Sequence, residues 1–322
     1  MQQATSIIEP VRERLDRVQQ NLKGMADPRF PFLSQQLDHV FDSVGKKLRP
    51  AITLLTSSFY EHDPKVTEQM ATAVELLHIA TLIHDDTVDD SDIRRGKATL
   101  SSLWGRNVAV LVGDYIFAAS ATSVCDTGNI RVIRCFAETI MELSRGELHE
   151  MIESQSADQT MDQYLDRIYN KTASLFTTAS ESGAILSGAP EEIVTDMREY
   201  GYNLGLAFQI VDDILDFKGS EEEIGKPVGS DLAHGIMTLP AILATERFPD
   251  ENAIKMYVEH PEDEKSGERA MDLILNSSII DESYSVAEQY SAKALRRLDC
   301  LPKGHYRASL EELVYYVLRR RS

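Results

Sequence analysis

Two short acidic clusters with the same spacing constrain this chain more than any other feature of its sequence. The first ends an apolar stretch at residues 75–96, ELLHIATLIHDDTVDDSDIRRG, and includes Asp85 and Asp89. Residues four apart share one face of a helix, where two like charges destabilise each other unless a cation lies between them. Exposed carboxylates suit Mg²⁺, which shares its ligands between protein, water and substrate phosphates. The cluster therefore predicts an Mg²⁺ site; the alternative is a solvated acidic helix end.

The second cluster lies inside an even more apolar stretch, residues 205–217, GLAFQIVDDILDF. Gln209, Asp212 and Asp216 are spaced i, i+3, i+7 and are expected on a common helix face. Burying aspartates in such a run is costly unless they are paired or bind a metal. The repeat predicts two acidic helices that face each other across a cavity and hold Mg²⁺ ions, which in turn hold a polyphosphate.

Six ordered motifs resemble the trans-isoprenyl diphosphate synthases of the polyprenyl synthetase family. A lone DDxxD also occurs in terpene cyclases, but the paired motif with GKKLRP and KT is not their pattern. The motifs are GKKLRP at 45–50, ELLHxxxLIHDDxxDxxxxRRG at 75–96, AVLVGDYIF at 109–117, KTASLF at 171–176, FQIVDDILDF at 208–217 and GKPVGSDLxxGxxTLP at 225–240.

The resemblance implies one all-α domain over residues 1–322, a helical bundle around a central cavity with the isoprenoid synthase fold. Strand signals are scarce, which agrees with this expectation. The implied reaction is Mg²⁺-dependent, head-to-tail addition of isopentenyl diphosphate to an allylic diphosphate, with about three Mg²⁺ ions held when substrate is bound.

The resemblance also assigns the site residues. The implied metal ligands, in the first or second coordination shell, are Asp85, Asp86, Asp89, Asp212, Asp213 and Asp216. The implied contacts to isopentenyl diphosphate are Lys46, Arg49, His78 and Arg95, and those to the allylic diphosphate are Arg94, Lys171 and Lys226, with Thr172 and Gln209 orienting the site. Catalysis is expected to depend most on Asp85, Asp89, Asp212, Lys171 and Arg94. Without the resemblance, solvated helix ends and surface lysines would explain the basic residues equally well.

One position departs from the family pattern. Where many relatives have Lys two residues before Thr-Leu-Pro, this chain has Ile236. The missing cation leaves the role of this loop open. At the chain end, Arg319 to Arg321 are either a solvated tail or a basic flap near the site.

The resemblance implies that product length depends on residues just upstream of the first acidic cluster, here Ala80, Thr81 and Leu77. No aromatic residue stands there to stop a growing chain. From Asp85 back to Pro64 a helix spans about 30 Å, which is room for roughly six to eight isoprene units. The expected product is a medium to long prenyl chain of the kind used in quinones. The alternative is that Ala80 is small because two helices pack there.

Charge and leader signals favour a cytoplasmic protein. Lys and Arg number 33 against 52 Asp and Glu, a formal net charge of −19, which argues against nucleic acid as a partner. Three cysteines without metal-type spacing indicate a reducing compartment. The N-terminus lacks the apolar core of a signal peptide, so membrane contact is expected at most peripherally, for product release.

Several functions compete with a self-sufficient homodimeric enzyme. The chain is alternatively the catalytic large subunit of a two-component synthase that needs a small accessory subunit, or a shorter-chain, geranylgeranyl-type synthase. A noncatalytic regulatory subunit is less favoured, because such a subunit has no physical reason to keep aspartates in apolar helices. A di-iron bundle would need paired Glu-x-x-His motifs, and no such pair is present.

Overall fold

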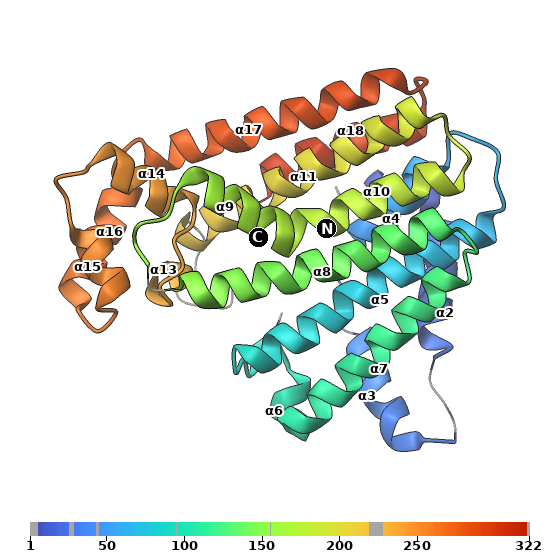
Figure 1. Cartoon of the computed structure of the whole chain (residues 1–322), viewed down its shortest axis with the longest axis horizontal. Coiled ribbons are helices and arrows are strands. Elements are labelled where there is room, and N and C mark those ends of the chain that lie inside the picture. Colours follow the sequence, from blue (N-terminus) through green and yellow to red (C-terminus); the bar gives the residue numbers. More distant parts are fainter. Residues whose placement is uncertain are drawn as a thin grey trace. The chain divides into compact units, whose positions relative to one another are not determined.

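The computed structural model describes residues 6–25, 29–42, 45–94, 96–154, 156–218 and 228–320 (Figure 1). Within these ranges the chain is almost entirely helical, and the two strands form a single short hairpin in which Ile93 pairs with Ala98 and Arg94 with Lys97. The predicted all-α class is confirmed. Contacts divide the chain into two compact units, and a single domain over residues 1–322 stays a prediction.

The first unit comprises Met1–Ala137, Thr178–Arg198 and Leu298–Glu312. Its elements are η1 (Glu9–Val11), α2 (Arg12–Lys23), α3 (Pro31–Phe41), α4 (Leu48–Ser57), α5 (Pro64–Val88), β1 (Ile93–Arg94), β2 (Lys97–Ala98), α6 (Leu100–Trp104), α7 (Arg106–Cys125) and η3 (Leu298–Cys300).

The second unit comprises Glu138–Thr177, Glu199–Arg297 and Leu313–Ser322. Its elements are α9 (Met161–Ile168), the π-helical segment η2 (Tyr169–Ala173), α13 (Ser230–Ala233), α14 (Leu239–Arg247), α15 (Ala253–Glu259), α16 (Glu264–Leu275) and α17 (Ile279–Arg297). The helices that give residues to both units are α8 (Ile130–Glu153), α10 (Ser174–Leu186), α11 (Glu191–Lys218) and α18 (His305–Arg319).

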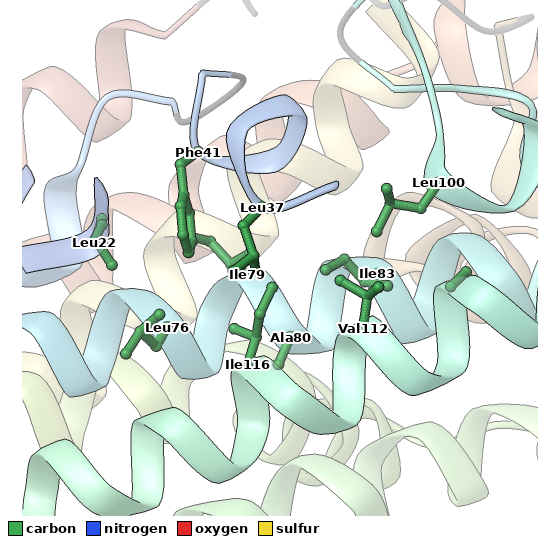
Figure 2. Packing of buried hydrophobic residues seen from close by; sticks show 11 residues of the cluster. Leu22, Leu37, Phe41, Leu76, Ile79, Ala80, Ile83, Leu100, Val112 and Ile116 are labelled. Atoms are coloured by element: carbon green, nitrogen blue, oxygen red, sulfur yellow. The ribbon is translucent and has the colours of Figure 1, made fainter. Parts of the chain in front are cut away.

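Helix α5 carries the first acidic cluster and is the central helix of its unit. Asp63 caps its start by accepting a 3.0 Å hydrogen bond from the backbone N–H of Lys65, and Pro64 occupies the first helical position, where its missing N–H costs nothing. The helix packs along α7, and Figure 2 shows Ala80 of α5 close to Ile116 of α7 within one buried cluster. This packing fixes where the last turn of α5 ends.

Helix α7 meets α5 closely at Gly113. A Cβ at this position would lie 2.3 Å from Nε2 of His84, the residue directly before the acidic cluster. The helix is not buried along its whole length, since Leu111 is 68% exposed. The Asp114 side chain is 63% exposed and lies 3.5 Å from Nε2 of the half-buried His84. Among the described residues α7 alone is long and apolar enough to cross a membrane, a property that core helices share.

Glycines bring α11 against η2 and the start of α10 in the second unit. A Cβ at Gly201 would lie 2.5 Å from the carbonyl oxygen of Phe176, and one at Gly205 would lie 2.6 Å from Cα of Ala173. Only glycine allows backbones to approach this closely. Because Gly201, Gly205 and Gln209 are each four residues apart, this face of α11 continues directly into the second acidic cluster.

Candidate active site

The first acidic cluster occupies the last turn of α5, where helix carbonyl groups already favour a cation. Asp89 is exposed at the helix end, Asp85 is half-buried, and Asp86 is buried. Nε of Arg94, on β1, donates a 2.6 Å hydrogen bond to Oδ1 of Asp86. Asp86 therefore orients Arg94, whereas Asp85 and Asp89 have the better access to solvent. Arg95 lies outside the described residues.

The GKKLRP motif places two neighbouring lysines in different environments. Lys47 has φ of +52°, a left-handed conformation that is uncommon outside glycine, and it stands immediately before α4. Burial lowers the pKa of the Lys47 ammonium despite the carboxylate of Glu75, whereas Lys46 is exposed. This left-handed residue therefore stands between the exposed Lys46 and the start of α4.

Arg49 and His78, both predicted to bind isopentenyl diphosphate, meet in the structure. Nη1 of Arg49 donates a 3.3 Å hydrogen bond to Nε2 of His78, which lies two turns before Asp85 on α5. Both side chains are half-buried. The first unit thus places the guanidinium of Arg49, on α4, against the imidazole of His78 on α5, the helix that carries the first acidic cluster.

The second acidic cluster separates its three aspartates into three environments. Asp212 is half-exposed, and its Oδ1 accepts a 2.9 Å hydrogen bond from Nη2 of Arg320. Asp216 is buried, and its Oδ2 accepts from the backbone N–H of Asp231 at 3.2 Å. Of the three, Asp212 is the one best placed to coordinate a metal ion.

Asp213 is fully enclosed beside α9. Its Oδ2 accepts a 2.6 Å hydrogen bond from the Tyr164 hydroxyl, and its Oδ1 accepts one of 2.7 Å from Nε2 of Gln209. Burial raises the pKa of Asp213 to about 8, although both hydrogen bonds act in the opposite direction. Gln209 in turn accepts a 2.7 Å hydrogen bond from Thr172. Gln209 and Asp213 are one turn apart on α11, so this hydrogen bond is compatible with the predicted common face of Gln209, Asp212 and Asp216.

Lys171 and Thr172 belong to the π-helical segment η2, and such segments are frequent at functional sites. Nζ of Lys171 forms ion pairs with Glu150 and, at 3.3 Å, with Glu147, both on α8. Gly146 makes room for this arrangement, since a Cβ there would lie 2.6 Å from the backbone nitrogen of Lys171. The ammonium is thus held by two carboxylates and stays partly exposed.

Glu147 and Glu150 are missing from the sequence prediction. Their i, i+3 spacing on an amphipathic helix is that of any solvated acidic face, and the neighbouring Gly146 is the one signal that a second backbone passes there.

Lys226 and Arg321 lie outside the described residues. Ile236 stands where many relatives have a lysine, and its backbone N–H donates a 2.9 Å hydrogen bond to the carbonyl of Asp231.

The described residues contain no group of three or more His, Cys, Asp or Glu side chains that would enclose a metal ion without help. Mg²⁺ commonly takes one or two carboxylates and completes its shell with water and substrate phosphates. The hard oxygen ligands of Asp85, Asp89 and Asp212 fit that pattern. The facing arrangement of the two acidic helices stays a prediction.

The chain-length candidates lie on α5 before the acidic cluster. Ala80 and Leu77 are fully buried, and Ala80 belongs to the cluster that includes Ile116, while Thr81 is half-buried. The structure is compatible with the packing alternative for Ala80. A separate pocket of about 650 Å³ between α2, α5 and α7 does not include these three residues.

Known proteins resemble this chain along most of its length. Residues 30–274 match the polyprenyl synthetase family. The chain is 39% identical to solanesyl-diphosphate synthase 2 of Oryza sativa subsp. japonica over 98% of this chain and 79% of that protein. It is 37% identical to heptaprenyl diphosphate synthase component 2 of Geobacillus stearothermophilus over 95% of both chains.

Solved structures give the same result. Heptaprenyl diphosphate synthase from Staphylococcus aureus superposes with a TM-score of 0.91 at 36% identity, over 97% of this chain and 99% of that one. A polyprenyl synthase from Caulobacter crescentus CB15, complexed with calcium and isoprenyl diphosphate, superposes with a TM-score of 0.90 at 32% identity, over 99% of this chain and 98% of that one. The fold and the two acidic motifs define a prenyltransferase. The chain belongs to the polyprenyl synthetase family.

Proposed function

We propose that this chain catalyses the Mg²⁺-dependent addition of isopentenyl diphosphate to an allylic diphosphate. The product is a medium to long all-trans prenyl diphosphate, used for a quinone side chain, and the reaction takes place in the cytoplasm. The observation that carries the proposal is the presence of Asp85, Asp89 and Asp212 at positions with solvent access, with Arg94 hydrogen-bonded to the neighbouring Asp86 and Arg320 to Asp212. The names of the relatives, which include solanesyl and heptaprenyl diphosphate synthases, support the medium to long product class.

The chain's own residues bind and orient the allylic diphosphate. Arg94, oriented by Asp86, and Lys171, held by Glu147 and Glu150, direct positive charge at this leaving group. Mg²⁺, when bound, neutralises the diphosphate so that the allylic C–O bond can ionise. Because the charged groups of Arg94 and Lys171 are already held in place, little free energy is spent on reorienting them as negative charge develops on the leaving diphosphate.

Arg49, His78 and the exposed Lys46 hold isopentenyl diphosphate. The double bond of this substrate attacks C1 of the allylic cation and forms the new C–C bond, while a proton is lost from the isopentenyl C2 to the released diphosphate. Water must be excluded, because it would trap the cation as an alcohol. Lys226 and Arg95 are proposed to add charge to the allylic and isopentenyl diphosphates respectively.

We propose a homodimer in which helices pair across subunits. The supporting observation is the exposed apolar side of α7, where Leu111 is 68% exposed and Val110 and Tyr115 are each 40% exposed. Apolar side chains exposed along one helix are typical of a protein interface. Peripheral contact with a membrane is proposed only for release of the lipid product.

A second candidate is the catalytic component of a two-component synthase. It is favoured by the relative from Geobacillus stearothermophilus, which is named component 2 and aligns over 95% of both chains. In that case the purified chain alone would bind substrate without elongating it.

Product analysis of the purified single chain with Mg²⁺, isopentenyl diphosphate and farnesyl diphosphate tests both candidates. Long prenyl diphosphates would support the self-sufficient enzyme. Their measured length would define the product more exactly than the medium to long class proposed here. An absence of product, together with an EDTA-sensitive thermal shift on adding substrate, would support the two-component candidate. An absence of both product and binding would refute the proposed function.

A further inference from the structure

The last described residue of the chain lies on the second acidic cluster. Nη2 of Arg320 is 2.9 Å from Oδ1 of Asp212, and the guanidinium carbon lies 4.0 Å from the ring centroid of Phe208. Although it follows the end of α18, the Arg320 side chain is only 10% exposed, against 49% for Asp212. A side chain this enclosed at a helix end has a definite binding position.

That position has two parts, which come from consecutive turns of α11. Phe208 supplies the face of an aromatic ring, which attracts a guanidinium, and Phe176 supports this ring at 5.2 Å between centroids. One turn later, Asp212 supplies the carboxylate. Nη1 of Arg320 is buried and finds no hydrogen-bond partner among residues 6–320 that the structure describes. The carboxylate contact is therefore the one polar bond that the guanidinium of Arg320 makes there.

The other two aspartates of this cluster are engaged elsewhere. Asp213 is enclosed by Tyr164 and Gln209, and Asp216 accepts from the backbone of Asp231. Asp212 is the exposed aspartate of the three, and its Oδ1 already carries a cation supplied by the chain itself. A divalent cation bound by Asp212 competes with the guanidinium, because two cations at one carboxylate repel each other and each neutralises the same negative charge.

We propose that Arg320 is a built-in competitor of the divalent cation at Asp212 and thereby sets the metal affinity of the second acidic cluster. The inference rests on the proposed function only for the assignment of Asp212 as a metal ligand. Without metal, the ion pair neutralises the cluster's exposed carboxylate. With metal, Asp212 exchanges one cation for another, and the guanidinium keeps Phe208 as its remaining support.

Binding of Mn²⁺, measured without substrate from the electron paramagnetic resonance signal of the free ion, tests this proposal. Arg320→Ala is expected to bind Mn²⁺ about threefold to tenfold more tightly than the wild type, because it removes an ion pair and a cation–π contact. Arg319→Ala is the matched control: it removes the same charge one residue earlier, where Nε of Arg319 contacts the carbonyl of Tyr315. Its affinity should stay at the wild-type value. Phe208→Leu should give a smaller gain than Arg320→Ala.

Repeating the Arg320→Ala and Arg319→Ala measurements in an Asp212→Asn background makes the test specific to Asp212. There, Arg320→Ala should have no further effect on Mn²⁺ affinity. Unchanged or weaker binding in Arg320→Ala, an equal gain in Arg319→Ala, or a gain that persists without Asp212 would each overturn the proposal. Turnover is not needed for these measurements, so product analysis of the wild type decides the proposed function separately.

Discussion

Arg49 donates a hydrogen bond to Nε2 of His78 at 3.3 Å, and the resemblance of the sequence to its family assigns both residues to the same substrate. Arg49→Ala should raise KM for isopentenyl diphosphate about 10-fold to 100-fold and leave KM for the allylic substrate nearly unchanged. The reason is the loss of a charge-assisted hydrogen bond, worth about 1.5–3 kcal/mol. Steady-state kinetics with each substrate varied in turn measures this, with the exposed Lys65→Ala as the control. Equal effects on both KM values would contradict the assignment.

Asp212 and Asp213 are neighbours in sequence but should respond to substitution in opposite ways. Asp212→Ala should abolish turnover and leave the free energy of unfolding of the metal-free protein nearly unchanged. Asp213→Ala should lower that free energy by about 1–3 kcal/mol, because it leaves the buried Tyr164 hydroxyl and the Gln209 amide without their acceptor. Urea unfolding in EDTA, beside a turnover assay, measures both. Near-normal turnover in Asp212→Ala would refute the metal assignment.

Glu150 should act on the reaction through Lys171. Each single substitution, Glu150→Ala and Lys171→Ala, is expected to raise KM for the allylic diphosphate about 10-fold or more, since a lysine without its ion pairs loses its fixed position. The double variant should be little worse than Lys171→Ala alone. Glu138→Ala, exposed on the same helix α8, is the control. Additive losses in the double variant would show that Glu150 acts independently.

Ala80 and Thr81 differ in how much room they have for a larger side chain. Ala80→Phe should shorten the prenyl product and cost about 1–3 kcal/mol of stability, because Ala80 is fully buried beside Ile116. Thr81→Phe should be better tolerated, since Thr81 is half-buried and its hydroxyl donates a 2.8 Å hydrogen bond to the carbonyl of His78 within the same helix. Chromatography of the products and thermal unfolding measure the two effects. An unchanged product from both variants would remove these positions from chain-length control.

The burial of Glu181, which lies outside the candidate active site, predicts that the stability of the protein depends on pH. Burial raises the pKa of Glu181 above its ordinary value of 4.5, although Arg198 at 4.0 Å and Arg131 at 3.6 Å act against this. A carboxyl with a raised pKa binds its proton more tightly in the folded protein, so its contribution to stability is lost as pH rises through the folded pKa. Glu181→Gln should therefore gain stability relative to the wild type between pH 4.5 and neutrality. Urea unfolding at several pH values measures this, and an opposite slope would contradict it.

Periodicity and spacing predicted the long helices that carry the two acidic clusters. The helical pattern from Pro64 to Asp90 corresponds to α5, and the apolar run with the second acidic cluster corresponds to α11. The resemblance assigned Arg49 and His78 to one substrate, and the structure adds the hydrogen bond between them. These features depend on residues close in sequence, or on motifs that belong to a family whose members share this fold.

The rest depends on which surfaces meet in three dimensions. Residues 28–32 resemble a loop in sequence, yet α3 begins at Pro31, where the fixed φ of proline suits a first helical position. The separation of Asp212 from Asp213 requires Tyr164, which lies about fifty residues away in sequence. The π-helical segment at Lys171 likewise reflects the passage of α8, which helical periodicity alone does not reveal.

Gly146 shows how a residue without a side chain can be mistaken for a catalytic one. A single added methyl group would lie 2.6 Å from the backbone nitrogen of Lys171, so α8 or η2 would have to move. An alanine scan of α8 would then record a loss of activity at Gly146 comparable to that of a residue that touches substrate. In this enzyme, the space between two backbones is itself part of what a mutational map of the active site would detect.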